Sequence, residues 1–277
     1  MKKRLLIAAM LVCALSAALL AGCGNDAGSS AGDDPVRFVI GATPVPHTEI
    51  LEFVQPKMLE EGIDMQIRTF TDFVQPNHST QAGDLDANYF QHRPFMDNFN
   101  QTNNTEMVAL FPVHFEPLAL YRSRTENLSD LGSGSIIAIP NDPTNGARAL
   151  NLLEAAGLIT LRDGAGVLAT RLDITDNPLG LDIRELEAAQ IPHILPDVDM
   201  AVINGNFALQ AGLEIGIDSV AQEEKDSISA QTYANYIVVR ADNENDERVQ
   251  TLIRIMSSDA VREFIETRYE GRVVPVF

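Results

Sequence analysis

The chain has 277 residues and a formal net charge of −19 at pH 7, and this length suffices for one large domain or two lobes with buried cores. So acidic a protein is not expected to bind nucleic acid or to adsorb to anionic lipid, because both require basic patches. Both cysteines, Cys13 and Cys23, lie near the N-terminus. The rest of the chain therefore offers no disulfide, no thiol nucleophile and no cysteine metal site.

The N-terminus has the pattern of a secretory signal peptide that ends in a lipidation site. Basic residues at positions 2–4 precede an apolar run, and Leu20-Ala21-Gly22-Cys23 is similar to a bacterial lipobox. We expect residues 1–22 to be cleaved and Cys23 to be acylated, so that it becomes the mature N-terminus. The alternative is an uncleaved membrane anchor, since the apolar run is near the lower length limit for a spanning helix.

A polar segment rich in Gly, Ser and Asp follows the lipobox. It contains no core-forming residues, which predicts a flexible tether over residues 23–35. The remaining residues, 36–277, then form the globular domain. Anchor, tether and domain in this order are the layout of a lipoprotein held at a membrane surface.

Hydrophobic patterns predict an α/β fold. Apolar or alternating runs predict strands at 36–41, 65–70, 107–111, 118–121, 136–139, 183–186, 200–203 and 236–240. Helical spacing predicts helices at 50–59, 142–153, 246–256 and 259–268. The first strand, helix and strand form a βαβ unit, which implies a parallel sheet with helices on its faces.

The strands fall into two groups, joined near residues 117–124 and again late in the chain. We therefore expect two lobes with a cleft between them. Ligands in open α/β sheets bind at the carboxyl ends of strands. Four polar or aromatic segments occur at such ends, namely 70–77, 83–95, 140–150 and the pair 203–207 with 233–236.

Arg148 is the best candidate for binding an anion. It lies in the first turns of a predicted helix, where unpaired backbone N–H groups attract negative charge, and its planar guanidinium matches a carboxylate. Such a charged hydrogen bond contributes about 1.5–3 kcal/mol. In the alternative interpretation, Asp142 or Thr144 caps the helix and Arg148 pairs with a surface acid.

The aromatic and amide side chains near the strand ends have two interpretations as well. Phe70, Phe73, Phe90 and His92 are either core residues or the wall of an apolar pocket, and a thioether would suit such a pocket. Asn204 and Asn235 flank apolar strands. They either satisfy the backbone in turns or recognise the head group of an amino acid.

No enzymatic signature is present in the sequence. It lacks a Gly-x-Ser-x-Gly elbow, a phosphate-binding P-loop and a dinucleotide fingerprint. The histidines show no pair at the spacing of a helical metal site. We therefore predict no catalytic residue, no metal and no cofactor.

In order, the four segments resemble the methionine-binding lipoproteins that serve ABC importers. The matching stretches run from Phe70 to Asn77, from Gly83 to Phe95 and from Pro140 to Leu150, with Ala201–Asn204 and Tyr233–Asn235 following. Two stretches depart from the family pattern. Phe73 stands where the family often has Tyr, and Gly205-Asn206-Phe207-Ala208 replaces the usual Thr-Thr-Tyr-Ala.

The resemblance implies a two-lobed, type II periplasmic-binding-protein-like fold and a role for each candidate residue. Arg148 would bind the ligand carboxylate with Asn145 beside it, and Asn204 and Asn235 would hold the amino group and the carboxylate edge. The side-chain pocket would be formed by Phe73, Phe90 and His92, with Phe70 as possible support.

The resulting prediction is a lipid-anchored substrate-binding protein that delivers methionine, L- or D-, to the permease and ATPase of an ABC importer. It would act as a monomer at the cell membrane, facing the periplasm or the cell exterior. One alternative keeps the fold but changes the ligand to another amino acid or a short peptide. Another is a surface lipoprotein without a transport role, such as a sensor or an adhesin.

Overall fold

Two β-sheets provide the framework on which the candidate residues are arranged. The computed structural model describes residues 34–225 and 228–277, and Pro35–Phe277 forms one unit. The predicted signal peptide, Cys23 and nearly all of the tether lie outside the described residues. Among the residues that are described, no helix is long and apolar enough to cross a membrane.

The first sheet has six strands in the order β13-β4-β12-β3-β1-β2. Their bounds are β1 Val36–Ala42, β2 Ile63–Thr69, β3 Ala87–His92, β4 Met107–Phe115, β12 Asn235–Arg240 and β13 Val274–Pro275. β1 is parallel to β2 and β3, as the predicted βαβ unit requires. β12 runs antiparallel between β3 and β4.

The second sheet has five strands in the order β11-β5-β10-β6-β9. Their bounds are β5 Ala119–Arg122, β6 Ile136–Pro140, β9 Asp182–Leu186, β10 Met200–Ile203 and β11 Ser219–Gln222. β6 is parallel to β9 and β10, whereas β5 is antiparallel to its neighbours. A small separate ribbon consists of β7 Thr160–Leu161 and β8 Ile174–Asp176.

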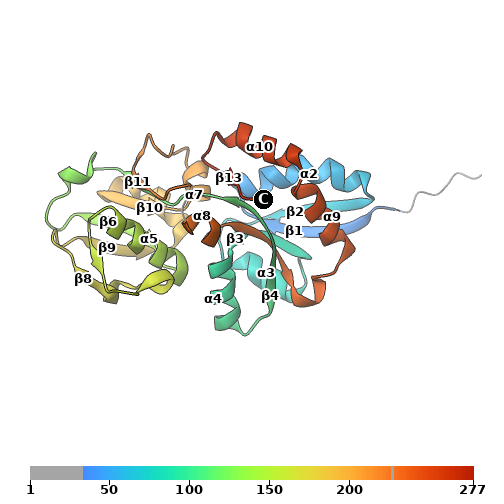
Figure 1. The fold of residues 1–277 in the computed structure, drawn as a ribbon, viewed down its shortest axis with the longest axis horizontal. Helices are drawn as coiled ribbons and strands as arrows, with labels where there is room; N and C mark the ends of the chain where they lie inside the picture. The colour runs from blue at the N-terminus through green and yellow to red at the C-terminus, as the bar shows by residue number, and fades with distance from the viewer. Residues whose placement is uncertain (1–33, 226–227) are drawn as a thin grey trace, which may run out of the picture. The chain divides into compact units, whose positions relative to one another are not determined.

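Helices cover both sheets (Figure 1). Their bounds are α2 Glu49–Glu60, α3 Gln75–Ala82, α4 Arg93–Asn103, α5 Pro143–Ala155, α6 Ile191–Ile194, α7 Gly205–Gln210, α8 Ile228–Thr232, α9 Glu247–Met256 and α10 Asp259–Tyr269. α2, α9 and α10 contribute Ile50, Leu252 and Ile265 to the core of the first sheet. α5 contributes Leu150 and Leu153 to that of the second. The predicted α/β class is therefore confirmed.

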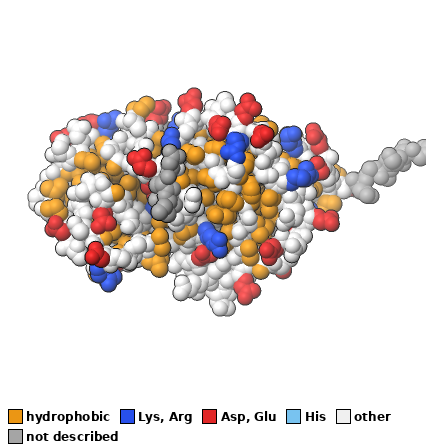
Figure 2. Space-filling view, viewed as in Figure 1, with side chains coloured by type: hydrophobic (Ala, Val, Ile, Leu, Met, Phe, Trp, Pro, Cys, Tyr) orange, Lys and Arg blue, Asp and Glu red, His pale blue; other side chains and the backbone are white. Residues whose placement is uncertain are grey.

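The chain crosses between the two sheets twice. The first crossing, residues 116–118, joins β4 to β5, and the second joins β11 to β12. This connectivity brings the carboxyl ends of β1 and β3 in one sheet together with those of β6 and β10 in the other. On the surface, the basic side chains visible in Figure 2 stand among acidic ones, in keeping with the negative net charge.

The strand predicted at 107–111 is longer in the structure. β4 continues through Pro112 to Phe115, and the pairing of β12 with β4 shifts register on either side of Tyr236, which lies opposite Pro112. Such an irregularity accommodates a proline, which cannot donate a ladder hydrogen bond. β3, α3 and α4 were not predicted as elements. β3 lies within the 83–95 motif, and α3 and α4 begin within the 70–77 and 83–95 motifs.

Asp142 and Thr43 differ in whether their side chains cap a helix. Asp142 caps α5 by accepting a hydrogen bond from the Asn145 backbone N–H at 2.9 Å. Thr43 makes no cap hydrogen bond at the start of its helix. Its hydroxyl instead lies 2.8 Å from His47 Nδ1. The threonine therefore orients a histidine, whose position becomes important below.

The first sheet's core should be sensitive to truncation at Ile237. This side chain in β12 is fully buried, so Ile237→Ala should lower the free energy of unfolding by about 2–5 kcal/mol in urea titrations. Leu172→Ala is the control, because Leu172 is 95% exposed, and its effect should stay within about 0.5 kcal/mol. Equal stability of the two variants would contradict the assigned core.

Candidate functional site

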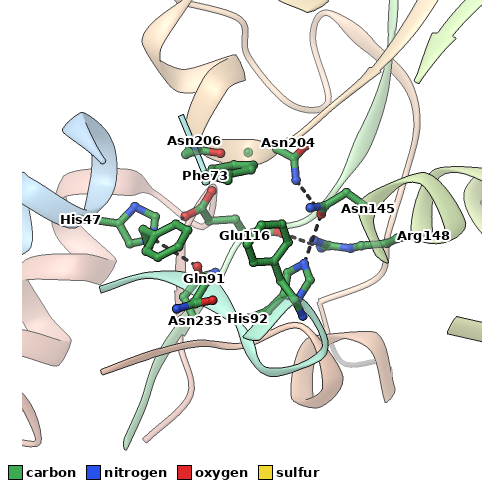
Figure 3. Close-up of a pocket in the computed structure, with 13 residues that line it drawn as sticks. His47, Phe73, Gln91, His92, Glu116, Asn145, Arg148, Asn204, Asn206 and Asn235 are labelled. Atoms are coloured by element: carbon green, nitrogen blue, oxygen red, sulfur yellow. Dashed lines mark hydrogen bonds and ion pairs between the residues drawn. The ribbon is translucent and has the colours of Figure 1, made fainter. Parts of the chain in front are cut away.

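A small cavity lies where residues of both sheets converge (Figure 3). Seven of the side chains that line it are those predicted from sequence, namely Phe73, Phe90, His92, Asn145, Arg148, Asn204 and Asn235. Six further lining residues are His47, Gln91, Phe95, Glu116, Gly205 and Asn206. The structure therefore gathers the predicted residues around one space, while their contact with a ligand stays a prediction.

Phe70, the predicted supporting residue, is not among the lining residues. It lies beneath β1, where a Cβ atom placed on Gly41 would come within 3.1 Å of the Phe70 ring and 2.5 Å of Leu85. Only a glycine fits β1 at this point. Phe70 therefore packs against β1 beside Gly41 and is not one of the residues that line the cavity.

Arg148 is buried and already carries a counter-ion. Its Nε and Nη2 donate to the two carboxylate oxygens of Glu223 at 2.8 and 2.5 Å, and Nη2 also donates to the Glu116 carbonyl at 2.9 Å. The Tyr233 ring stacks against the guanidinium, 4.3 Å from Cζ to the ring centroid. The acid that pairs with Arg148 is thus buried, not on the surface. Its Nη1 makes no such bond to any described residue, so this end of the guanidinium is the part left for a ligand.

Asn145 connects the two sides of the cavity. Its Oδ1 accepts from Asn204 Nδ2 at 2.8 Å and lies 3.1 Å from His92 Nε2, while its Nδ2 donates to the Asp142 carboxylate at 3.0 Å. His92 Nδ1 accepts from the Phe95 backbone N–H, so the proton of the neutral ring is on Nε2. Burial, and then the charge of Arg148, lowers the pKa of His92 to about 3. His92 is therefore neutral and held in a single orientation.

Two buried polar atoms of the lining residues lack a partner. Asn204 Oδ1 and Asn206 Nδ2 make no hydrogen bond to any residue that the structure describes, although Asn204 is 7% and Asn206 3% exposed. An unsatisfied buried polar group costs about 1–3 kcal/mol. One free acceptor and one free donor beside a cavity match a ligand that carries groups of both kinds.

Aromatic rings form the apolar side of the cavity. The Phe73 centroid lies 4.8 Å from that of Phe207, 6.0 Å from Phe95 and 6.1 Å from Phe90. These rings come from different elements on both sides of the space, and such separations are typical of packed aromatic pairs. Phe95 lines the cavity although the sequence motifs gave it no role, whereas Phe207 packs on Phe73 and is not a lining residue.

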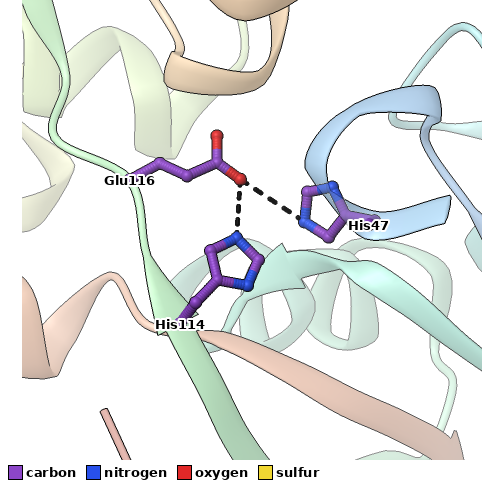
Figure 4. A group of neighbouring side chains, drawn as sticks. All are labelled: His47, His114 and Glu116. Atoms are coloured by element: carbon purple, nitrogen blue, oxygen red, sulfur yellow. Dashed lines mark hydrogen bonds and ion pairs between the residues drawn. The ribbon is translucent and has the colours of Figure 1, made fainter. Parts of the chain in front are cut away.

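A polar cluster borders the cavity through Glu116 and His47, and sequence reasoning missed it (Figure 4). Glu116 Oε1 is 2.7 Å from His114 Nε2 and 3.6 Å from His47 Nε2. The Tyr89 hydroxyl contacts His114 Nδ1. Ligand atoms of His47, His114 and Glu116 lie within 4.8 Å of one another, so the three could hold a metal ion. Histidine spacing along a helix could not reveal this group, because His47 and His114 belong to different elements.

Ionisation in this cluster follows from burial. Desolvation lowers the pKa of His47 to about 4 and that of His114 to about 3, and it raises the pKa of Glu116. Both imidazoles are therefore neutral at neutral pH and act as hydrogen-bonding groups. No sequence pattern pointed to Glu116, because the preceding strand was expected to end at residue 111.

The chain is similar to known proteins over most of its length. The family model described as NlpA lipoprotein matches residues 38–277. The D-methionine-binding lipoprotein MetQ of Salmonella typhimurium is 39% identical over 258 residues, which is 92% of each chain.

Two solved structures are similar over the same region. A nutrient binding protein from Burkholderia cenocepacia bound to methionine has a TM-score of 0.82 at 40% identity, covering 87% of this chain and 100% of that one. An ABC transporter periplasmic substrate-binding protein from Coxiella burnetii has a TM-score of 0.81 at 36% identity, covering 86% and 100%. The described part of the chain thus has the two-lobed fold of these binding proteins.

The buried histidines should make stability depend on pH. Below pH 6.5 the unfolded chain takes up a proton at His92 that the folded protein, with its lowered pKa, does not, so acid favours unfolding. Between pH 7 and 5 the free energy of unfolding of the wild type should therefore fall by about 2 kcal/mol more than that of His92→Gln. Urea titrations at both pH values measure this difference.

His193→Gln is the control for this comparison, because His193 is exposed. This variant should keep the pH dependence of the wild type. If His92→Gln also kept it, the buried neutral state of His92 would be wrong.

Proposed function

The chain belongs to the NlpA lipoprotein family, and we propose that it is a lipid-anchored substrate-binding protein that captures methionine, L- or D-, for an ABC importer. The single observation that carries this proposal is the convergence of seven predicted side chains on one buried cavity. Arg148 supplies a cation at this cavity, and Asn204 supplies an unpaired acceptor. The names of the similar proteins, one of them bound to methionine, point to the same ligand.

The ligand carboxylate would bind the Nη1 end of Arg148, because Glu223 occupies Nε and Nη2. Asn145 would assist indirectly, since its own polar atoms already hold His92 and Asp142. Because the guanidinium is already oriented, binding of the carboxylate costs little conformational entropy of the Arg148 side chain. Charged hydrogen bonds of this kind contribute about 1.5–3 kcal/mol each.

The amino group would lie near the amide oxygens of Asn204 and Asn235. Asn204 Oδ1 is unpaired among the described residues, and Asn235 Oδ1 lies 3.2 Å from His47 Nε2. The thioether side chain would extend between Phe73 and Phe90, with His92 at the edge of this pocket. Contacts between sulfur and aromatic rings contribute about 0.3–1.5 kcal/mol each.

Closure of the lobes on the ligand would couple binding to transport. The lining residues come from both sheets, so a ligand that contacts both sides stabilises the closed arrangement relative to an open one. Direct contacts also cross the cavity, as between His92 and Asn145. The closed protein, acting as a monomer, would then dock on the permease, whose ATPase drives release.

The acyl chain on Cys23 would hold the domain at the cell membrane, facing the periplasm or the cell exterior. The tether lets the domain reach its permease at high effective concentration. Nothing in this mechanism requires chemistry on the ligand, and we propose a binding protein that is not an enzyme.

Isothermal titration calorimetry of residues 36–277 tests the proposal directly. L-methionine and D-methionine should each be compared with a panel of amino acids and short peptides. Saturable binding of methionine above the rest supports the proposal. A clear preference for another amino acid would keep the fold and change the ligand, and no heat or thermal stabilisation with methionine would reject methionine as the ligand.

Arg148→Lys should weaken methionine binding by a factor of about 10–100, because the ammonium keeps the charge and loses the fork geometry. The matched control is Arg162→Lys, since Arg162 pairs with Asp173 at 2.5 Å and is not a lining residue. Calorimetry gives both affinities, and thermal unfolding shows whether each variant is folded. Equal affinities for the two folded variants would exclude Arg148 as the carboxylate ligand.

Cys23→Ala should release the protein from the membrane without affecting binding. The expected result is a soluble full-length protein in cell fractionation that retains the affinity of the wild type for methionine. A Cys23→Ala protein that stays in the membrane fraction would support the uncleaved anchor instead.

A further inference from the structure

Glu116 is the one carboxylate among the residues that line the cavity, and the proposed function has not used it. It follows β4 directly at the start of the first crossing and is only 6% exposed. A buried carboxylate is unfavourable unless it has hydrogen-bond donors and a compensating charge. The Glu116 carboxylate therefore needs a cationic partner.

The backbone at Gly205 leaves room for the Glu116 carboxylate. A Cβ atom at Gly205 would lie 2.6 Å from Glu116 Cβ and 2.9 Å from Glu116 Oε2. Both separations are too short for any side chain at position 205. Gly205 is thus the residue that admits Glu116 at the cavity wall.

The histidines hold Glu116 in place without neutralising it. His114 Nε2 lies 2.7 Å from Oε1, and His47 Nε2 lies 3.6 Å away, but both rings are neutral at neutral pH. The nearby guanidinium of Arg148 directs its Nε and Nη2 to Glu223 and reaches Glu116 only at the backbone carbonyl. No Lys or Arg of the described residues forms an ion pair with the Glu116 carboxylate.

We propose that Glu116 is the anionic anchor for the ligand's ammonium group, which restricts the cavity to ligands with a free α-amino group. This inference rests on the proposed function. The ammonium would bind the Glu116 carboxylate and the unpaired Oδ1 of Asn204, while Arg148 takes the carboxylate. A carboxylate and a guanidinium that line the same cavity then match the two charges of an amino-acid zwitterion, and N-acylated amino acids are excluded.

A chemical double-mutant cycle tests this assignment. Wild type and Glu116→Gln are each titrated with L-methionine and with 4-(methylsulfanyl)butanoate, which is methionine without its amino group. Gln keeps the size of the side chain and removes its charge. Glu116→Gln should weaken methionine binding by a factor of about 10–100 and change the affinity for the desamino compound by less than about threefold. Should another amino acid bind better, that amino acid and its desamino counterpart replace the pair.

Glu49→Gln is the matched control. Glu49 is also partly buried and bound to Arg268 and Tyr269, but it does not line the cavity. This variant should bind both compounds as the wild type does. Thermal unfolding of each variant establishes that it is folded before the affinities are compared.

The outcomes separate the two proposals. If wild type binds methionine and Glu116→Gln discriminates equally well against the desamino compound, the anchor role is wrong and the proposed function stands. If wild type binds no amino acid, both are wrong. A repeat with EDTA addresses the metal alternative, since His47, His114 and Glu116 could also hold a cation. Unchanged affinity supports the ammonium anchor, and loss of affinity that Zn²⁺ restores would overturn it.

Discussion

The ion pair between Arg148 and Glu223 is the interaction on which the cavity depends. Removing a guanidinium from water is costly, and the cost is offset only by a counter-ion with good geometry. Glu223 provides this with two short hydrogen bonds, and the Tyr233 ring covers one face of the guanidinium. The pair ties α5 to the residue that follows β11 and leaves Nη1 as the guanidinium nitrogen without a bond to a described residue. Loss of either partner would leave a buried charge without compensation.

Around this pair, the polar groups of the cavity hold one another in fixed positions. Asn145 fixes His92 and Asn204. On the side of the first sheet, Asn77 exchanges hydrogen bonds with Gln91 and accepts another from Asn88. Networks in which every member is satisfied are rigid. Against this background, the unpaired atoms of Asn204 and Asn206 stand out as the places where the network is incomplete.

The sequence predicted most of the fold and half of the lining residues for identifiable reasons. Strands buried on both faces, such as β1, appear as continuous apolar runs, and Asp142 marks the start of α5 through its capping side chain. Glu116 could not be found in this way. Pro112 suggested that β4 ends early, whereas an irregularity in the pairing with β12 lets the strand continue to the cavity.

Other parts of the site depend on contacts between segments far apart in the chain, which a single sequence does not reveal. His47 follows β1 and His114 belongs to β4, strands that β3 and β12 separate in the sheet, yet their ring centroids lie 4.9 Å apart. The role of Gly205 likewise becomes visible only from its distance to Glu116. The partner of Arg148 could not be identified either, since many acids were available and the fold alone selects Glu223. Helical and strand periodicities describe one element at a time, whereas these pairings are properties of the assembled sheets.

The positions of the two acids on the chain have a mechanical consequence. Glu116 begins the first crossing, and Glu223 directly follows β11 where the second crossing begins. Movement at either connection would displace one of the two glutamates beside Arg148, since Glu223 binds it through its carboxylate and Glu116 through its backbone carbonyl. The electrostatic field inside the cavity would then change together with the angle between the lobes. A substitution far along either connection would in this way alter affinity without contacting the ligand.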